Sequence, residues 1–383
     1  MMAVMPPGAA IALLEGTRVK WNVLLPLAGF ALAGVAFAGG AESAAWDPRA
    51  AAAYLDQRAE WWIGWQRAAL DHDTFCVSCH TSLTYALGRP ALRQAAGETG
   101  ASPGERRILE NVRRRVRLWS ETEPYYSDAK RGVPKTAESR STESVLNALI
   151  LTVSDARTGE SGAETVQALD HMLALQFRTG EQAGAWQWLD FHNQPWEAGD
   201  SQFWGSTLAA VAIGSAPAAY RSTPAVRDAL ALLRGYLLRE EGRQSGLNRL
   251  GLLWAASLNA GLLPQEARDR IVKESLSRQR ADGGWSSASL LSPDWKRRDG
   301  TALESGSDGY VTALAAFALE RSGTPGSAPG IERALAWLAA NQDRATGRVP
   351  AWSPNLQRDP ATDAGRLMSD AATAWAALAM ERR

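Results

Sequence analysis

Six apolar, alanine-rich segments recur along the chain, and their spacing constrains the fold more than any other feature. Most of them open with Ser, Thr, Asp or Asn, the residues that cap exposed N–H groups at helix starts. Most are apolar on nearly every side, which predicts helices that are buried on nearly every side. The segments are CHTSLTYALG (79–88), STESVLNALIL (141–151), DSQFWGSTLAAVAIG (200–214), LNRLGLLWAASLNAG (247–261), SDGYVTALAAFALE (307–320) and MSDAATAWAALAM (368–380).

A helical segment with a charged face precedes each apolar segment. No stretch of useful length alternates apolar and polar residues, so the sequence predicts an all-α fold. Self-similar helix pairs indicate a repeat architecture. Since neither terminal repeat is sharply polar, we expect a closed α/α toroid of about six helix pairs, with the apolar helices inside and the charged helices outside. The charged-face segments span roughly 47–70, 105–121, 163–177, 224–241, 265–279 and 329–341.

One short motif adds a family resemblance. The segment QRADGGW (279–285) resembles the Gln-x-x-x-Gly-x-Trp repeat of the squalene–hopene cyclase and prenyltransferase toroid superfamily, and looser echoes lie at 175–188 and 341–352. The resemblance covers roughly 47–383 and implies an α/α toroid in which the Gln and the Trp tie the end of an outer helix to the start of an inner one. It speaks for the fold and hardly for the activity.

The N-terminal segment is typical of an export signal. Arg18 and Lys20 precede an apolar stretch that ends at Ala36-Phe37-Ala38, a small-x-small cleavage pattern. We expect a signal peptide over 1–38, a short linker over 39–46 and a single toroid domain over 47–383. An uncleaved anchor is the alternative, because about 18 apolar residues can just span a bilayer. After cleavage the protein would be periplasmic or otherwise exported, with at most peripheral membrane association.

Both cysteines of the chain lie in the segment CVSCH, as Cys76 and Cys79, with His80 directly behind them. In an exported protein this segment resembles the attachment motif of c-type haem. If it forms one helical turn, the two thiols share a face and can add to the two vinyl groups of one haem, while His80 ligates the iron. We therefore expect one covalent haem c. The alternatives are a disulfide or redox thiol pair, a zinc site that is short of ligands, and chance.

The other axial ligand of such a haem would be Met, His or water. Met368 is the best-placed thioether, because ring closure sets its helix beside the helix that follows the haem motif. His192 lies in a long loop and could reach the iron, whereas His72 would need a hairpin to do so. Absence of a second protein ligand is the further alternative.

The same end of the inner helices also carries candidate cavity-rim residues. The acids and serines among them would alternatively cap helices, and the two aromatic residues would alternatively belong to the core. The candidates are Glu143, Asp200, Ser201, Trp204, Asp308, Tyr310, Ser369 and Asp370.

These features favour an exported haem-c protein on a terpene-cyclase-like scaffold. It would act in electron transfer or in haem-centred redox chemistry on a small apolar ligand, and the sequence leaves open whether it is an enzyme or a carrier and which redox partner it serves. A net charge of zero gives no reason to expect nucleic acid. One alternative is a squalene-cyclase-like enzyme, although Asp71-His72-Asp73-Thr74 departs from the Asp-x-Asp-Asp acid. Another is a glycan hydrolase that uses Glu143 with Asp200 or Asp308.

Overall fold

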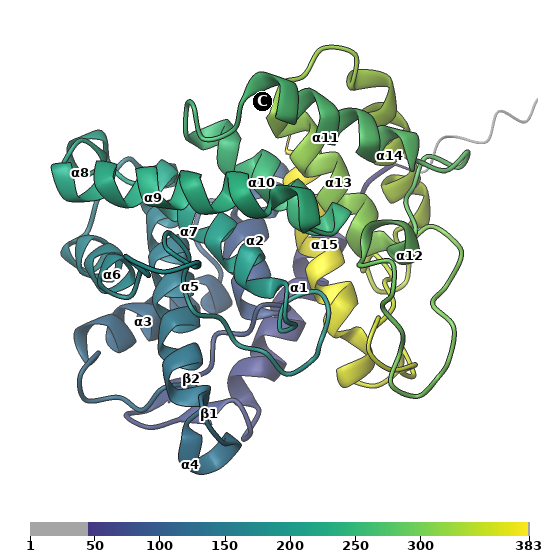
Figure 1. Cartoon of the computed structure of the whole chain (residues 1–383). Helices are drawn as coiled ribbons and strands as arrows, with labels where there is room; N and C mark the ends of the chain where they lie inside the picture. Colours follow the sequence, from purple (N-terminus) through teal and green to yellow (C-terminus); the bar gives the residue numbers. More distant parts are fainter. Residues whose placement is uncertain (1–44, 382–383) are drawn as a thin grey trace, which may run out of the picture. The chain divides into compact units, whose positions relative to one another are not determined.

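The computed structural model describes residues 45–381 and confirms an all-α toroid of six helix pairs (Figure 1). The outer helices are α1 (Pro48–Gly64), α3 (Pro103–Arg117), α6 (Ala163–Ala174), α9 (Pro224–Glu240), α11 (Gln265–Ser277) and α14 (Ala328–Asn341). The inner helices are α2 (Ser82–Ala96), α5 (Lys135–Thr158), α7 (Ser201–Ser215), α10 (Gly246–Leu258), α13 (Gly309–Ser322) and α15 (Leu367–Met380). The expected signal peptide over 1–38, and most of the linker, lie outside the described residues.

Short elements fill the connections between these helices. Two of them form a small antiparallel hairpin, which the sequence did not predict, with Ala69 opposite Phe75 and Leu70 opposite Thr74. Its two-residue strands are too short to show an alternating pattern. The short elements are β1 (Ala69–Leu70), β2 (Thr74–Phe75), α4 (Asp128–Arg131), α8 (Ala218–Arg221), α12 (Ser287–Leu290) and the 3-10 turns Glu241–Arg243 and Ala364–Arg366.

Burial separates the two rings as predicted. Every residue of α13 from Gly309 to Leu319 is buried, and so is every residue of α15 from Met368 to Ala379. The outer helix α3 instead buries one face, which includes Ile108, and leaves its other face to solvent. Helices buried all round can only sit inside a layer of other helices, so the apolar segments form the inner ring.

The inner ring closes on itself. Each inner helix packs against the next along the chain, and α15 packs against α2, while α1 contacts both of them. Gly88 lies at the crossing of α2 and α15, where an added Cβ atom would stand 2.5 Å from the carbonyl oxygen of Ala374. Only a residue without a side chain allows the first and last inner helices to approach this closely.

The glutamine motif acts as a staple between neighbouring outer helices. The Gln279 side chain donates to the carbonyls of Gly283 and Gly330, each at 2.8 Å, and so ties its own loop to α14. Trp285 completes the motif by donating from Nε1 to the carbonyl of Ser275 at 2.7 Å. The echo at Gln176 repeats this pattern, donating to a loop carbonyl and to the carbonyl of Ala229 in α9. The staple therefore reaches the next outer helix, a link that the resemblance did not imply.

A third copy of this staple closes the ring. The Gln342 amide donates to the carbonyls of Gly347 and Asp47, each at 2.9 Å, and accepts the N–H of Asp47 at 2.8 Å. Asp47 is the residue that caps α1. The device that joins consecutive pairs thus also joins the last pair to the first.

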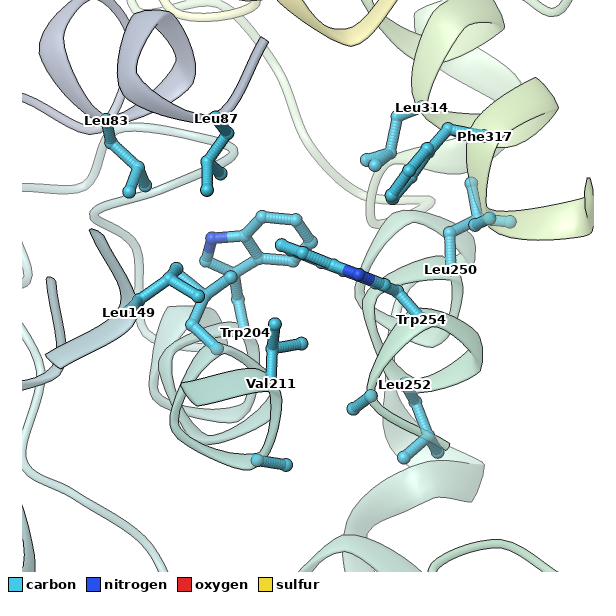
Figure 2. Close-up of a cluster of buried hydrophobic side chains, with 14 of the residues drawn as sticks. Leu83, Leu87, Leu149, Trp204, Val211, Leu250, Leu252, Trp254, Leu314 and Phe317 are labelled. Atoms are coloured by element: carbon cyan, nitrogen blue, oxygen red, sulfur yellow. The ribbon is translucent and has the colours of Figure 1, made fainter. Parts of the chain in front are cut away.

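Large aromatic side chains fill the centre of the ring. Trp254, Phe317 and Trp375 pack on one another with ring centroids 5.2–5.5 Å apart. Figure 2 shows Trp204 and Trp254 surrounded by leucines from several inner helices. Trp204 is 1% exposed and therefore belongs to the core, which corrects its placement at the cavity rim.

Candidate functional site at the N-terminal ends of the inner helices

The hairpin β1–β2 leads directly into the cysteine motif and fixes where it starts. The side chain of Asn111 on α3 brackets Phe75, accepting its N–H at 2.8 Å and donating to its carbonyl at 3.0 Å. The N–H of Cys76 donates to the carbonyl of Ala68 at 2.8 Å, and Trp62 Nε1 donates to the carbonyl of Cys76 at 2.7 Å. The backbone at Cys76 is thus held from α1, from α3 and from the hairpin.

The motif precedes the helix instead of forming its first turn. The Ser78 hydroxyl accepts the N–H groups of Thr81 and Ser82 at 3.2 and 3.1 Å, so α2 begins only at Ser82. The expectation that Cys76 and Cys79 share one helical turn is therefore wrong. Both thiols lie on an irregular segment, which a serine inside the motif holds against the helix start.

The two thiols are not joined in a disulfide, and both are kept protonated. Burial raises the pKa of each thiol, and the nearby carboxylate of Glu197 raises it further. Cys79 is 7% exposed and Cys76 is partly buried. Across residues 45–381, no three His, Cys, Asp or Glu side chains gather as a metal-binding group.

His80 is held in one tautomer by a relay of polar side chains. The Thr81 hydroxyl donates to the Asp370 carboxylate at 2.8 Å, so its oxygen can only accept from His80 Nδ1, which lies 2.8 Å away. Nδ1 therefore carries the proton, and Nε2 keeps its lone pair. Burial, helped by Arg58 and Arg358, lowers the pKa of His80 to about 3, so the imidazole is neutral.

Arg58 and Tyr54 of α1 anchor the far end of this relay. Both donate to Asp370 Oδ1, from Nε at 2.9 Å and from the phenol at 2.7 Å. Burial still raises the pKa of Asp370, although these donors and Thr81 oppose the shift. Asp370, proposed from the sequence as a rim acid, is thus an orienting group behind His80.

His80 and Met368 line the same cavity, together with Cys79. The cavity has a volume of about 140 Å³ and lies between the residues that precede α2, the first turn of α15 and the loops at 193–197 and 353–358. Met368, on the first turn of α15, is 5% exposed. Trp62 meets the His80 ring edge-on with centroids 5.0 Å apart, and Trp196 lies 6.0 Å from it. Cys76, the other cysteine of the motif, is not among the residues that line this cavity.

The two other histidines considered as iron ligands lie elsewhere. His192 has a side chain that is 86% exposed and lies near Asp190, outside the residues that line the cavity. His72 is in the hairpin turn beside Asp71, and its side chain is 40% exposed. Asp73 of the same turn is 93% exposed, so the Asp71–Thr74 string is not presented to the cavity as a cyclase acid would be.

Three of the proposed rim acids have structural partners. Glu143 is fully buried and pairs with Arg115 at 2.5 Å. Asp308 caps α13 and also accepts the N–H of Trp352 at 2.9 Å. Asp200 accepts from Gln194 at 2.7 Å and from Asn248 at 3.2 Å. These contacts hold the acids as caps and connectors.

The remaining rim candidates also have local roles. The Ser201 hydroxyl accepts the N–H of Ala198 at 2.8 Å, and the Ser369 hydroxyl accepts the N–H of Ala351 at 3.0 Å. The Tyr310 hydroxyl accepts from Trp196 Nε1 at 3.1 Å and so supports one wall of the cavity from behind.

Loop residues that the sequence did not single out complete the cavity. Gln194 and Asn355 close it between two loops through paired hydrogen bonds at 2.8 and 2.7 Å. Glu197 is a carboxylate in the lining, and burial raises its pKa. Arg358 adds the positive charge that helps to lower the pKa of His80. These residues lie in irregular segments without periodicity, so no sequence pattern pointed to them.

Comparisons with known proteins give structural likeness only. No protein-family profile matches the chain, and no curated protein matches it. A wild-type glycosidase is 17% identical with a TM-score of 0.47, over 86% of this chain and 97% of that chain. An inactive variant of the α-1,6-mannanase GH76A of Salegentibacter sp., in complex with α-1,6-mannotriose, is 11% identical with a TM-score of 0.49, over 88% of this chain and 99% of that chain.

A polysaccharide lyase is 14% identical with a TM-score of 0.37, over 88% of this chain and 90% of that chain. Values this low say nothing about chemistry, and the fold assignment rests on the helices and contacts of this chain. No helix among residues 45–381 is both long and apolar enough to cross a membrane.

Proposed function

We propose that the chain is an exported haem-c protein, in which Cys76 and Cys79 hold the group and His80 Nε2 ligates its iron. The observation that carries this proposal is the relay from Asp370 through Thr81, which leaves Nε2 of a neutral imidazole free to bind a metal. Metal-binding histidines commonly donate their other ring N–H to such a partner, which fixes the ring and its tautomer. The thiols are unpaired, as thioether formation requires.

Several side chains of the cavity suit the same group. When bound, a haem supplies a one-electron redox change at its iron, or an open coordination site. Met368 lines the cavity with His80, and its thioether could also ligate the iron of such a group. Trp62 and Trp196 pack near the imidazole, with ring centroids 5.0 and 6.0 Å from it. Arg358 supplies a positive charge that suits the carboxylates of a haem.

The size of the cavity sets a condition on this proposal. Pockets for drug-sized ligands span roughly 300–1,000 Å³, whereas this cavity measures about 140 Å³. The donor set fits a haem, but the cavity is too small to hold one unless part of its lining moves outward. The loops at 193–197 and 353–358 are the parts that would move, since the rest of the lining lies at the starts of α2 and α15. The electron-transfer partner would be a small redox protein, or a small apolar molecule that enters the widened cavity.

The test is covalent attachment in a host that exports proteins and attaches haem c. The purified protein should be red, should exceed the polypeptide mass by one haem, and should keep its colour after denaturation. Cys79→Ser should leave at most one thioether, and His80→Ala should change the Soret band. The control is the Ser257→Ala variant, remote from the motif, which should load like the natural protein. A colourless protein with the mass of the bare chain would overturn the proposal.

A second candidate function is glycan hydrolysis, and Glu197 is the observation that favours it. Glu197 lines the cavity with a raised pKa, as a general acid requires, and Asp190 is close enough to raise that pKa further. Glu197 and Asp190 thus take the place of the acids proposed from the sequence. Those acids, Glu143 together with Asp200 or Asp308, are held by other partners. Glycosidases use two carboxylates across the scissile bond.

Reducing-sugar release from a panel of soluble α- and β-glycans tests this second candidate. Activity that Glu197→Gln abolishes and Cys79→Ser leaves intact would establish a hydrolase. Lack of release from every glycan, in a protein that carries haem, would exclude it.

A further inference from the structure

A larger cavity opens at the opposite end of the ring from the cysteine motif. It has a volume of about 370 Å³, within the range typical of small-molecule pockets. All six inner helices contribute to it through their C-terminal ends, so it lies where the inner ring ends. It shares no lining residue with the cavity that contains His80, so an occupant here is separate from the proposed haem function.

The deep part of this cavity is apolar. Leu87, Trp254, Phe317 and Leu378 line it, and Trp254 and Phe317 pack edge-to-face with centroids 5.4 Å apart. Figure 2 shows Leu87, Trp254 and Phe317 converging from three different inner helices. Burying this apolar surface under an aliphatic chain is favourable in free energy.

The mouth of the cavity is charged. Arg157 at the end of α5 donates to both carboxylate oxygens of Glu381, at 2.8 and 3.0 Å. Arg321 lies 3.9 Å from the same carboxylate, and its guanidinium also stacks on the Phe317 ring. Two guanidinium groups therefore converge on one carboxylate at the rim of an apolar cavity. The carbonyl ends of the inner helices also face this rim, and the two arginines offset their negative partial charge.

We propose that this cavity binds a small amphipathic molecule with an aliphatic body and a carboxylate head. The aliphatic body would lie against Trp254, Phe317 and the leucines. The head would join Glu381 between the Arg157 and Arg321 guanidinium groups, which pair well with carboxylates. A neutral head lacks this charge pairing, and a cationic head meets two guanidinium groups around a carboxylate that already pairs with Arg157.

Calorimetric titration of the full chain with decanoate, decanol and decylamine tests the proposal. Decanoate should bind saturably and tightest, and decylamine weakest. Arg157→Gln should weaken decanoate binding about tenfold, and Glu381→Gln, which removes the competing carboxylate, should strengthen it. Neither substitution should change decanol binding by more than about twofold. Opposite signs for these two variants would not arise from general loss of folding.

A steric pair of variants locates the site. Ala156 is exposed at the mouth and lines the cavity, so Ala156→Phe should block entry and weaken decanoate binding at least tenfold. Thr158→Phe, on the same exposed helix end but outside the lining, should bind decanoate like the natural chain. The Cys79→Ser variant should also bind normally, because it lies at the other end. Absence of saturable binding, tighter binding of decylamine, or unaltered binding in Ala156→Phe would overturn the proposal.

Discussion

Single hydroxyl groups decide the chemistry of the cysteine motif. Thr81 links the His80 imidazole to Asp370, and Ser78 caps the start of α2 inside the motif. Cys76, Cys79 and His80 could be read from the sequence as one unit, because their spacing is itself a signal. The partners of His80 could not, since Asp370 lies 289 positions after Thr81 and meets it only when the ring closes.

Thr81→Val tests the relay at constant side-chain shape. It removes the acceptor for the Nδ1–H of His80 and a donor to a buried carboxylate, a type of bond worth about 1.5–3 kcal/mol. Thr84→Val is the matched control, because Thr84 is equally buried and donates only to backbone carbonyls. Urea unfolding should show that Thr81→Val costs about 1–2 kcal/mol more than Thr84→Val. Equal losses in the free energy of unfolding would show that the bonds from Thr81 to His80 and Asp370 add no stability beyond those of Thr84.

The raised pKa of Asp308 predicts a pH dependence of stability. Burial raises its pKa from 3.8 to about 6, against three backbone N–H donors. The folded chain then holds the Asp308 proton more tightly than the unfolded chain, so this group's contribution to the free energy of unfolding falls between pH 4 and pH 7. Two pKa units correspond to about 3 kcal/mol. Relative to Asp308→Asn, which does not titrate, the natural chain should lose stability over that interval in unfolding at several pH values. A constant difference would contradict the raised pKa.

At the scale of elements, the sequence located the helices well and their ends less well. The segment 368–380 became α15 (Leu367–Met380), because an apolar run with a capping residue marks a buried helix reliably. The segment 79–88 became α2 (Ser82–Ala96), later at both ends. Ser78 bonds to the backbone N–H groups at the start, and Gly88, where the predicted segment ended, is instead the contact with α15. Tertiary packing set both boundaries, so local pattern could not.

The Gln342 staple predicts how strongly one side chain holds the first pair to the last. Gln342→Ala removes three hydrogen bonds to buried or partly buried backbone groups. We expect a loss of about 2–3 kcal/mol, at about 1 kcal/mol for each bond. Asn341→Ala is the control, because the exposed Asn341 amide bonds only within its own helix. Hydrogen exchange of α1 amides should rise in Gln342→Ala and not in the control; unchanged exchange would show that helix packing alone closes the ring.

One repeated pattern predicts the fold of the whole molecule, whereas it does not predict the cavities. An apolar inner helix and a half-charged outer helix, repeated six times, are enough to predict a toroid. The cavity that contains His80 is built from helix starts and from the loops around 193–197 and 353–358, which differ from repeat to repeat. The repeats therefore predict the helical scaffold from the sequence. They do not predict the irregular loops that line the cavity, because those loops follow no repeating pattern.

Because Gln342 and Asp47 join the ends of the ring, the position of the break in the chain is arbitrary with respect to packing. A circular permutant should therefore fold, with a flexible linker from the end of α15 to the start of α1 and new termini in the exposed turn at Gly159–Gly162 between α5 and α6. Its circular dichroism and unfolding midpoint should lie near those of the natural chain. In such a molecule α6 and α7 form the first pair along the chain, so the covalent order of the repeats becomes separable from their order in space.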